Sequence, residues 1–221
     1  MHETSRVVVI LNGALEGNGA LIRMLDAADR VLAADGAGNW LAAHDRRPQL
    51  LLGDMDSIAP AVLARWEAEG VEIRRYPTHK DETDGELVLL AAAALHPEEM
   101  IVLGALGGRI DHTLGNLALL TMPEFDGILV RMFDGQSWLW LVTDRTEIRG
   151  APGDLVSLIP WGADAQGVHT SGLAYPLKGE TLHQGPSRGI SNVLVGDAAR
   201  VALARGRLLV VHTPLDGMEN R

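Results

Sequence analysis

Two aspartates two residues apart follow a buried-strand pattern in the first half of the chain. Residues 50–52 are leucines, which predict a strand covered on both faces, and Asp54 and Asp56 come just after it. In open α/β sheets, ligands bind beyond the carboxyl ends of the strands. Neighbouring carboxylates repel each other unless a cation or a proton offsets their charge, and oxygen ligands suit Mg²⁺. The pair therefore indicates a Mg²⁺ site, although a turn in which Ser57 caps the next helix would use the same residues.

A second cluster of charged residues precedes a strongly apolar helical segment. Thr83, followed three residues later by Glu86, is typical of a capping box at a helix start. That local role does not explain why Lys80, Asp81 and Asp84 lie at the same helix start. Acidic side chains are common in a first helical turn because the helix dipole favours them, which accounts for one of the two aspartates. Together with the lysine, the cluster favours a metal and phosphate site.

A third cluster combines glycines with a cation between a predicted strand and a predicted helix. Gly107 and Gly108 would allow the backbone to approach an anion closely, so that free N–H groups could bind phosphate. Arg109 would add a planar, two-pronged donor for the same phosphate. Asp111 could orient that arginine or cap the helix, and His112 is more typical of polar surface than of a catalytic base.

The first part of the chain alternates short apolar runs with helical patterns. Strands are predicted at residues 7–11, 31–34, 49–52, 71–76 and 100–106, and helices at 19–28, 37–44, 60–69, 86–95 and 110–121. This alternation is typical of βαβ units and of a mostly parallel sheet. Several of the strands end in a small or acidic residue, as at Asn12-Gly13 and Asp35-Gly36. We expect the site at that edge of the sheet.

The last part of the chain lacks helical patterns and is rich in turn residues. Strands are predicted at 155–159, 167–173, 192–195, 199–203 and 208–212, with Arg205-Gly206 joining the last two as a hairpin. Short strands of this kind favour a small antiparallel sandwich or barrel. The predicted fold class is therefore α/β: a Rossmann-like domain at residues 1–145, followed by an all-β sandwich at 146–221.

Composition narrows the class of protein. Lys and Arg number 19 against 29 Asp and Glu, which gives a net charge of −10 without a basic block and makes nucleic acid an unexpected partner. The absence of cysteine excludes disulfides, thiolate metal sites and cysteine nucleophiles. No secretory signal pattern and no apolar run of about 18 residues occur, so we expect a cytoplasmic protein without a membrane partner.

The motifs, taken in order, resemble those of the thiamine pyrophosphokinase family. The matching stretches are residues 53–57, 80–84 and 104–112, then Ser171-Gly172-Leu173 with Tyr175-Pro176-Leu177, and finally residues 190–192. The resemblance implies an enzyme that transfers pyrophosphate from the co-substrate ATP to the hydroxyethyl group of thiamine, giving thiamine diphosphate and AMP with Mg²⁺. It also implies a homodimer, with thiamine held between the α/β domain of one subunit and the sandwich of the other.

The resemblance also assigns roles to particular residues. It implies that Asp54, Asp56 and Asp84 are the catalytic and Mg²⁺-binding carboxylates, that Lys80, Asp81, Thr83, Gly107, Gly108, Arg109 and Asp111 bind the nucleotide, and that Ser191 and Asn192 bind thiamine. Either Asp56 or Asp84 would accept the proton of the thiamine hydroxyl. An aromatic residue often follows the Ser-Asn pair in the family, whereas Val193 and Leu194 stand there in this chain.

Three other functions use the same residues. A pyrophosphokinase acting on a hydroxymethyl pterin would share the metal and phosphate site and differ in the C-terminal pocket. A phosphohydrolase would use Asp54 as a nucleophile and release free phosphate. A non-catalytic regulator would bind nucleotide or thiamine without needing the complete set of carboxylates, so the set disfavours it.

Overall fold

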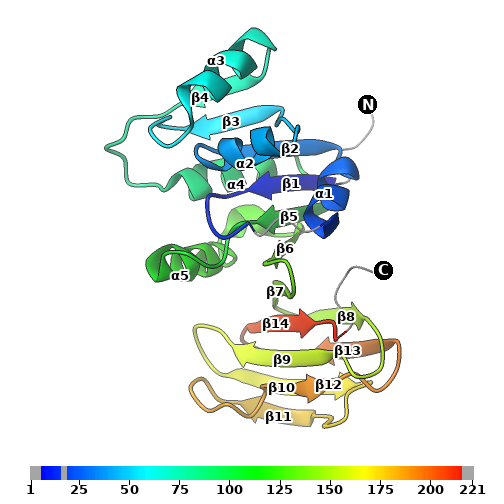
Figure 1. Cartoon of the computed structure of the whole chain (residues 1–221). Coiled ribbons are helices and arrows are strands. Elements are labelled where there is room, and N and C mark those ends of the chain that lie inside the picture. Colours follow the sequence, from blue (N-terminus) through cyan, green and yellow to red (C-terminus); the bar gives the residue numbers. More distant parts are fainter. Residues whose placement is uncertain (1–5, 16–18, 216–221) are drawn as a thin grey trace. The chain divides into compact units, whose positions relative to one another are not determined.

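The computed structural model describes residues 6–15 and 19–215, and the chain forms two compact units (Figure 1). The units divide between Gly135 and Gln136. The functional boundary expected between residues 145 and 146 stays a prediction. Within the described ranges, no helix is long and apolar enough to span a bilayer.

The first unit contains a parallel sheet. Its strands are β1 (Arg6–Ile10), β2 (Arg30–Ala34), β3 (Leu50–Gly53), β4 (Glu72–Arg75), β5 (Glu99–Leu103) and β6 (Leu129–Phe133), in the spatial order β4-β3-β2-β1-β5-β6. The order changes direction at β1. Strands β2, β3 and β4 follow one another on one side of β1, and strands β5 and β6 lie on its other side. All carboxyl ends of a parallel sheet lie at one edge, and such a change of direction opens a crevice there.

Helices connect the strands of the first unit. They are α1 (Gly19–Asp26), α2 (Ala37–Ala43), α3 (Pro60–Ala68), α4 (Asp84–Ala93) and α5 (Ile110–Leu119), with a 3₁₀ turn at Pro123–Phe125. The central helix α4 packs on β1, β2 and β3. Residues 7–10 of β1 have no exposed surface, as expected for a strand covered on both faces. The sequence-based prediction of alternating strands and helices is confirmed for this unit.

The second unit is built from antiparallel strands. They are β7 (Trp138–Val142), β8 (Arg145–Arg149), β9 (Leu155–Pro160), β10 (Ala165–Ser171), β11 (Lys178–Leu182), β12 (Asn192–Val193), β13 (Ala198–Ala202) and β14 (Leu208–Thr213). They form two sets, β12-β9-β14-β7 and β11-β10-β13-β8. Buried side chains of both sets share one apolar core, which includes Trp140, Val156 and Val210 from the first and Ile148 and Val201 from the second.

The predicted hairpin at Arg205-Gly206 is wrong. Strand β13 pairs with β8 and β10, whereas β14 pairs with β7 and β9, so the turn carries the chain from one set of strands to the other. The Arg205 backbone instead bridges to Gln166. A local turn pattern cannot distinguish a hairpin from a crossing between sheets, because long-range pairing decides which strands are neighbours. Strands β8 and β11 were not predicted, since charged and polar residues occupy most of their positions.

Candidate active site

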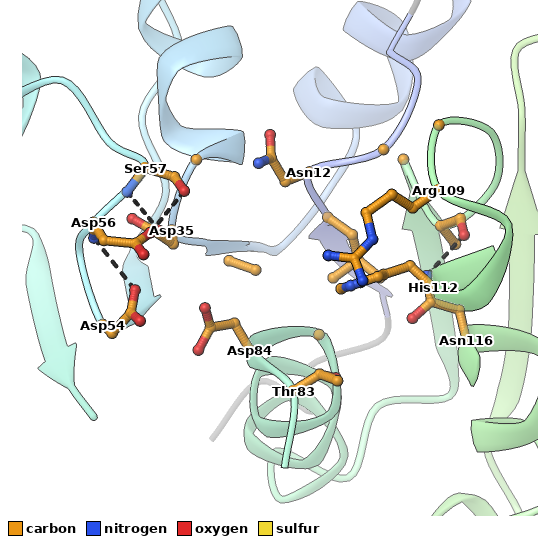
Figure 2. Close-up of a pocket in the computed structure, with 18 of the residues that line it drawn as sticks. Asn12, Asp35, Asp54, Asp56, Ser57, Thr83, Asp84, Arg109, His112 and Asn116 are labelled. Atoms are coloured by element: carbon orange, nitrogen blue, oxygen red, sulfur yellow. Dashed lines mark hydrogen bonds between the residues drawn. The ribbon is translucent and has the colours of Figure 1, made fainter. Parts of the chain in front are cut away.

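A cavity of about 780 Å³ lies at the carboxyl edge of the parallel sheet. Its walls come from the residues that follow β1, β2, β3, β4 and β5 and from the first turns of α4 and α5. Figure 2 shows carboxylates on one side of this cavity and Arg109 and His112 on the other. The predicted site residues that line it are Asp54, Asp56, Lys80, Thr83, Asp84, Gly107, Gly108 and Arg109. The volume is in the range that proteins use for small-molecule ligands.

Three carboxylates from separate elements meet in the cavity. Oxygen atoms of Asp35, Asp54 and Asp84 lie within 4.8 Å of one another. Asp35 follows β2, Asp54 follows β3, and Asp84 begins α4. Carboxylates at this spacing repel one another, and an oxygen-binding cation between them removes that repulsion.

Asp35 was not among the predicted site residues. It is 5% exposed, and its two oxygens accept hydrogen bonds from the N–H groups of Ser57 (3.0 Å) and Ile58 (3.1 Å). Burial raises the pKa of its carboxyl group, while these two hydrogen bonds act against the rise. In the sequence, Asp35 stands at the end of a predicted strand, next to Gly36. That position identified the edge of the sheet, but it did not identify the Asp35 side chain as a ligand.

Asp56 lies beside the group of three acids but is not one of them. Its N–H donates to Asp54 Oδ1 (3.3 Å), and its own Oδ1 accepts a hydrogen bond from the Ser57 hydroxyl (2.7 Å). Burial acts to raise the pKa of Asp54, but the Asp56 N–H, the Thr78 hydroxyl and the Lys80 charge lower it overall. Asp54 is therefore held as an anion at neutral pH, and the neighbouring Asp56 carboxyl also helps to raise the pKa of Asp35.

Gly53 allows the carboxylates to come together. A Cβ atom at this position would lie 2.7 Å from the Cβ of Asp35 and 3.2 Å from Oδ2 of Asp84. The first distance is shorter than non-bonded carbon atoms tolerate. A side chain at Gly53 would therefore push Asp35 and Asp84 apart.

Lys80 and Asp84 form an ion pair at the cavity wall. Lys80 Nζ lies 2.9 Å from Asp84 Oδ1 and donates a hydrogen bond to the Pro77 carbonyl (3.1 Å). The ion pair lacks hydrogen-bond geometry, so this buried Asp84 oxygen has no hydrogen-bond donor among the described residues. A buried carboxylate oxygen without a donor is costly unless a cation contacts it, and the Lys80 ammonium supplies that contact here. The three carboxylates of Asp35, Asp54 and Asp84 form an oxygen donor set that fits a hard divalent cation such as Mg²⁺.

Thr83 has the capping role that its sequence context predicted. Its hydroxyl accepts a hydrogen bond from the Glu86 N–H (3.0 Å), and α4 begins at the next residue. The N-terminus of α4 consequently opens on the cavity, where its backbone dipole favours negative charge. Asp81 is exposed in the preceding turn and does not line the cavity.

Arg109 and Asp111 form a two-pronged pair at the start of α5. Arg109 Nε and Nη2 donate to Asp111 over 3.1 and 2.5 Å, and both side chains are largely exposed. The hydrogen bond from Arg109 lowers the pKa of Asp111 to about 2. Gly107 and Gly108 precede the pair with left-handed backbone angles (φ 79° and 70°), so the chain turns sharply into the helix. Of the pair, only Arg109 lines the cavity.

Ser191 and Asn192 belong to the second unit. Ser191 has a left-handed backbone (φ 58°), and its N–H donates to the Ser157 hydroxyl (3.0 Å). Asn192 starts β12, where it pairs with Val156 of β9. The Asn192 amide bonds to the main chain of Tyr175 over 3.0 and 2.8 Å.

Comparison with known families agrees with the motifs in both units. The model of the thiamin pyrophosphokinase catalytic domain matches residues 21–132, and that of the thiamin pyrophosphokinase vitamin B1 binding domain matches residues 145–208. The chain belongs to the thiamine pyrophosphokinase family. The match includes the three acids of the cavity, Lys80 and Arg109 in its first part, and Ser191 and Asn192 in its second.

Individual relatives extend the same result over most of the chain. Thiamine pyrophosphokinase of Bacillus subtilis is 28% identical over 176 residues, covering 75% of this chain and 78% of the relative. Thiamine pyrophosphokinase 1 of Oryza sativa is 30% identical over 220 residues, covering 88% and 82%. The crystal structure of the Bacillus subtilis protein matches with a TM-score of 0.85 at 24% identity, over 96% of this chain and 100% of that one. Yeast thiamin pyrophosphokinase matches with a TM-score of 0.83 at 18% identity, over 99% and 89%. These structures establish a shared fold, and neither the pterin enzyme nor the regulator is favoured.

Proposed function

We propose that this protein transfers the β,γ-pyrophosphate of ATP to the hydroxyl group of thiamine, giving thiamine diphosphate and AMP. The observation that carries the proposal is the meeting of Asp35, Asp54 and Asp84 next to Lys80, in a cavity onto which the N-terminus of α4 opens. Three carboxylates and a lysine around one space are suited to a metal-bound polyphosphate. Membership of the thiamine pyrophosphokinase family supports thiamine as the acceptor.

Asp35, Asp54 and Asp84 would hold Mg²⁺ in this proposal. Bound Mg²⁺ would neutralise charge on the triphosphate and polarise the β-phosphorus. Asp35 replaces Asp56 in the ligand set that the sequence implied, because Asp56 is not in the group within 4.8 Å. The two hydrogen bonds to the Asp35 oxygens would fix the orientation of this ligand.

The cationic side chains of the cavity would stabilise the transferring group. Lys80 is held between Asp84 and the Pro77 carbonyl, so its charge is fixed at the wall of the cavity before a nucleotide arrives. Arg109 would release Asp111 and bind a phosphate of the nucleotide instead. The backbone N–H groups of Gly107 and Gly108 would donate hydrogen bonds to phosphate oxygens. Thr83 would contribute by holding the start of α4 in place, and Asp81 and Asp111 would lie at the rim of the nucleotide site.

Asp56 is the better candidate for the general base. The thiamine hydroxyl oxygen would attack the β-phosphorus, the bond from that phosphorus to the α-phosphate oxygen would break, and AMP would leave. The hydroxyl proton would pass to Asp56, which is exposed and is not one of the three proposed Mg²⁺ ligands, whereas Asp84 is ion-paired with Lys80. Positioning and charge stabilisation would supply most of the acceleration, as in other phosphoryl transfers.

The second unit would supply the thiamine pocket. In this proposal the first unit, which ends at Gly135, is the Rossmann-like catalytic domain, and the second unit is the β-sandwich with Ser191 and Asn192 at the pocket. The shared apolar core of the two strand sets supports the sandwich description.

The active form would be a homodimer that shares its site between subunits. Helix α5 supports this arrangement, because none of its residues is buried although it carries four leucines and isoleucines. Ile110 and Leu114 on this helix are 76% and 55% exposed, one helical turn apart and adjacent to Arg109. A second copy would cover this apolar strip. The cytoplasmic location and the lack of a nucleic-acid partner stay predictions.

A product assay tests the proposed reaction. Purified protein is incubated with ATP, Mg²⁺ and thiamine, and the products are identified by mass spectrometry. AMP and thiamine diphosphate should form in equal amounts. Product formed only with a pterin alcohol would move the acceptor, and free phosphate without thiamine diphosphate would indicate a hydrolase.

A further inference from the structure

Asn39 binds the loop of residues 54–59, which carries two of the carboxylates of the cavity. Its Nδ2 donates a hydrogen bond to the Ser57 carbonyl (2.9 Å), and its Oδ1 accepts one from the Ala59 N–H (2.8 Å). Asn39 belongs to the first turn of α2 and does not line the cavity. Its amide therefore ties the start of the helix after β2 to the loop after β3 through both a donor and an acceptor.

Asp35 holds the same loop from the residue that precedes α2 by two positions. Its two oxygens accept hydrogen bonds from the N–H groups of Ser57 and Ile58, the first of which is visible in Figure 2. Three consecutive N–H groups, at residues 57–59, are thus bound by Asp35 and Asn39. Ile58 is only 4% exposed, so its side chain also anchors the loop. The cavity carboxylate and the amide outside the cavity act on one short piece of chain.

The loop has to be held because its backbone is strained. Met55, which separates Asp54 from Asp56, has a left-handed backbone (φ 65°). A residue other than glycine keeps such a conformation only where the surrounding contacts fix it. If those contacts loosened, Met55 could return to an ordinary conformation, and the carboxylates on both sides of it would move as well.

The bonds from Asn39 matter more for the geometry of the loop than for the stability of the fold. Ser57 and Ala59 are exposed, so water can take the place of both bonds when the amide is removed. The buried Ile58 side chain would still keep the loop in the folded chain. What would be lost is the fixed position of Asp54 relative to Asp35, whose oxygens lie within 4.8 Å of each other.

We propose that Asn39 is a positioning residue for the cation site, and that it acts by holding the loop of residues 54–59 against Asp35. Removing a group that orients metal ligands typically lowers the affinity for the metal by about 10- to 100-fold. Asn39 itself would touch neither the cation nor a substrate, because it lies outside the wall of the cavity. This inference rests on the metal site of the proposed function.

Binding of Mn²⁺, followed by the electron paramagnetic resonance of the free ion, tests the inference without turnover. Mn²⁺ is bound by the same oxygen ligands as Mg²⁺. Asn39→Ala should raise the Kd for Mn²⁺ by about 10- to 100-fold. His44→Ala is the matched control, because it removes a side-chain hydrogen bond to the Trp40 carbonyl (2.8 Å) at the other end of α2, outside the cavity. This control should bind Mn²⁺ as the unmodified protein does.

Two further measurements separate positioning from a general loss of structure. The Mg²⁺ concentration that gives half-maximal turnover should rise by the same factor in Asn39→Ala, whereas the KM for thiamine at saturating Mg²⁺ should not change. Hydrogen exchange of the amides at residues 57–59 should become faster in Asn39→Ala and stay the same in His44→Ala, since only the first variant releases the loop.

A second variant keeps the test valid if Asn39→Ala does not fold, which thermal melts establish. Asn39→Asp keeps the acceptor for the Ala59 N–H and loses the donor to the Ser57 carbonyl. Its added negative charge would by itself strengthen the binding of a cation. A raised Kd for Mn²⁺ in Asn39→Asp would therefore come from the lost hydrogen bond and would support the inference.

The remaining outcomes separate this inference from the proposed function. Asn39→Ala with the same Kd for Mn²⁺ as His44→Ala would overturn the inference alone. An unmodified protein that binds Mn²⁺ but makes no thiamine diphosphate would overturn the proposed reaction, and the two variants would still decide the role of Asn39. If the unmodified protein neither binds Mn²⁺ nor makes thiamine diphosphate, both the proposed function and the inference are wrong.

Discussion

Replacing Asp54 by asparagine separates the metal-binding role of the carboxylates from their effect on stability. Asparagine keeps the shape of the side chain and one acceptor oxygen for the Asp56 N–H. It removes one negative charge from the group of three acids. We expect Asp54→Asn to lower turnover by at least about 100-fold, because it removes a proposed Mg²⁺ ligand. We also expect the metal-free variant to be slightly less stable than the unmodified protein, because the lowered pKa of Asp54 means that the folded protein favours its charged form.

The size of the change is bounded by Coulomb's law. Two unit charges 4.8 Å apart interact by about 3.5 kcal/mol at an effective dielectric constant of about 20, and by about 1 kcal/mol in bulk water. Asp54→Asn removes the repulsions with Asp35 and Asp84, but it also removes the attraction to Lys80 and weakens the hydrogen bonds from the Asp56 N–H and the Thr78 hydroxyl. The lowered pKa of Asp54 means that these favourable contacts outweigh the repulsions. Because Asp54 and Asp84 are partly exposed, a loss of at most about 1 kcal/mol is expected, which lowers Tm by about 2–4 °C for a protein of this size.

Thermal unfolding with and without Mg²⁺ measures this effect. In chelator, Asp54→Asn should melt only slightly below the unmodified protein. At a saturating Mg²⁺ concentration the difference should widen, because a ligand at about 100 times its Kd stabilises the folded state by about 2.7 kcal/mol and the variant binds it weakly. Asp126→Asn is the control, since it removes an exposed acid of the same unit outside the cavity.

Three results would contradict this prediction. A variant that melts well above the unmodified protein in chelator would mean that repulsion among the three carboxylates outweighs the contacts that favour the Asp54 charge. An equal rise of Tm with Mg²⁺ in both proteins would mean that the cation binds elsewhere. Near-normal turnover of Asp54→Asn would exclude this residue from the metal site whatever the melting temperatures.

Two further substitutions test the nucleotide site and the dimer. Arg109→Ala should raise the KM for ATP by about 10- to 100-fold through loss of a two-pronged phosphate contact, with little change for thiamine. Asp111 has a pKa of about 2 beside Arg109 and an ordinary pKa of about 3.9 without it, so it stays charged in both proteins and the effect should be equal at pH 6 and pH 8. Equal KM values in both proteins would mean that Arg109 does not contact the nucleotide. Leu114→Glu should convert a dimer to an inactive monomer in analytical ultracentrifugation, because the residue is 55% exposed on a helix without buried residues. Leu95→Glu, at an exposed site after α4, is the control, and an active dimer of Leu114→Glu would rule out α5 as the interface.

Sequence patterns that span only a few residues were sufficient to predict much of the fold and part of the site. The leucines before Gly53 predicted a buried strand, and the structure has β3 there with all of its residues buried. Thr83 predicted the start of α4 because its hydroxyl and the Glu86 N–H are brought together by the helix itself. Arg109 and Asp111 are two residues apart, so their pairing was also accessible. Each of these features depends on backbone geometry over one turn.

Contacts between distant segments were decided only by the tertiary structure. Asp35 joins Asp54 and Asp84 because β2 and β3 are neighbours in the sheet and α4 packs on both, which no local pattern specifies. The crossing at Arg205-Gly206 depends on which strands β13 and β14 pair with. Asn192 matched a family motif in the sequence, but only the folded chain shows that its amide is bound to Tyr175, 17 residues earlier. The sequence by itself thus determined which elements form and which residue types gather at strand ends, whereas the packing of those elements determined which side chains meet.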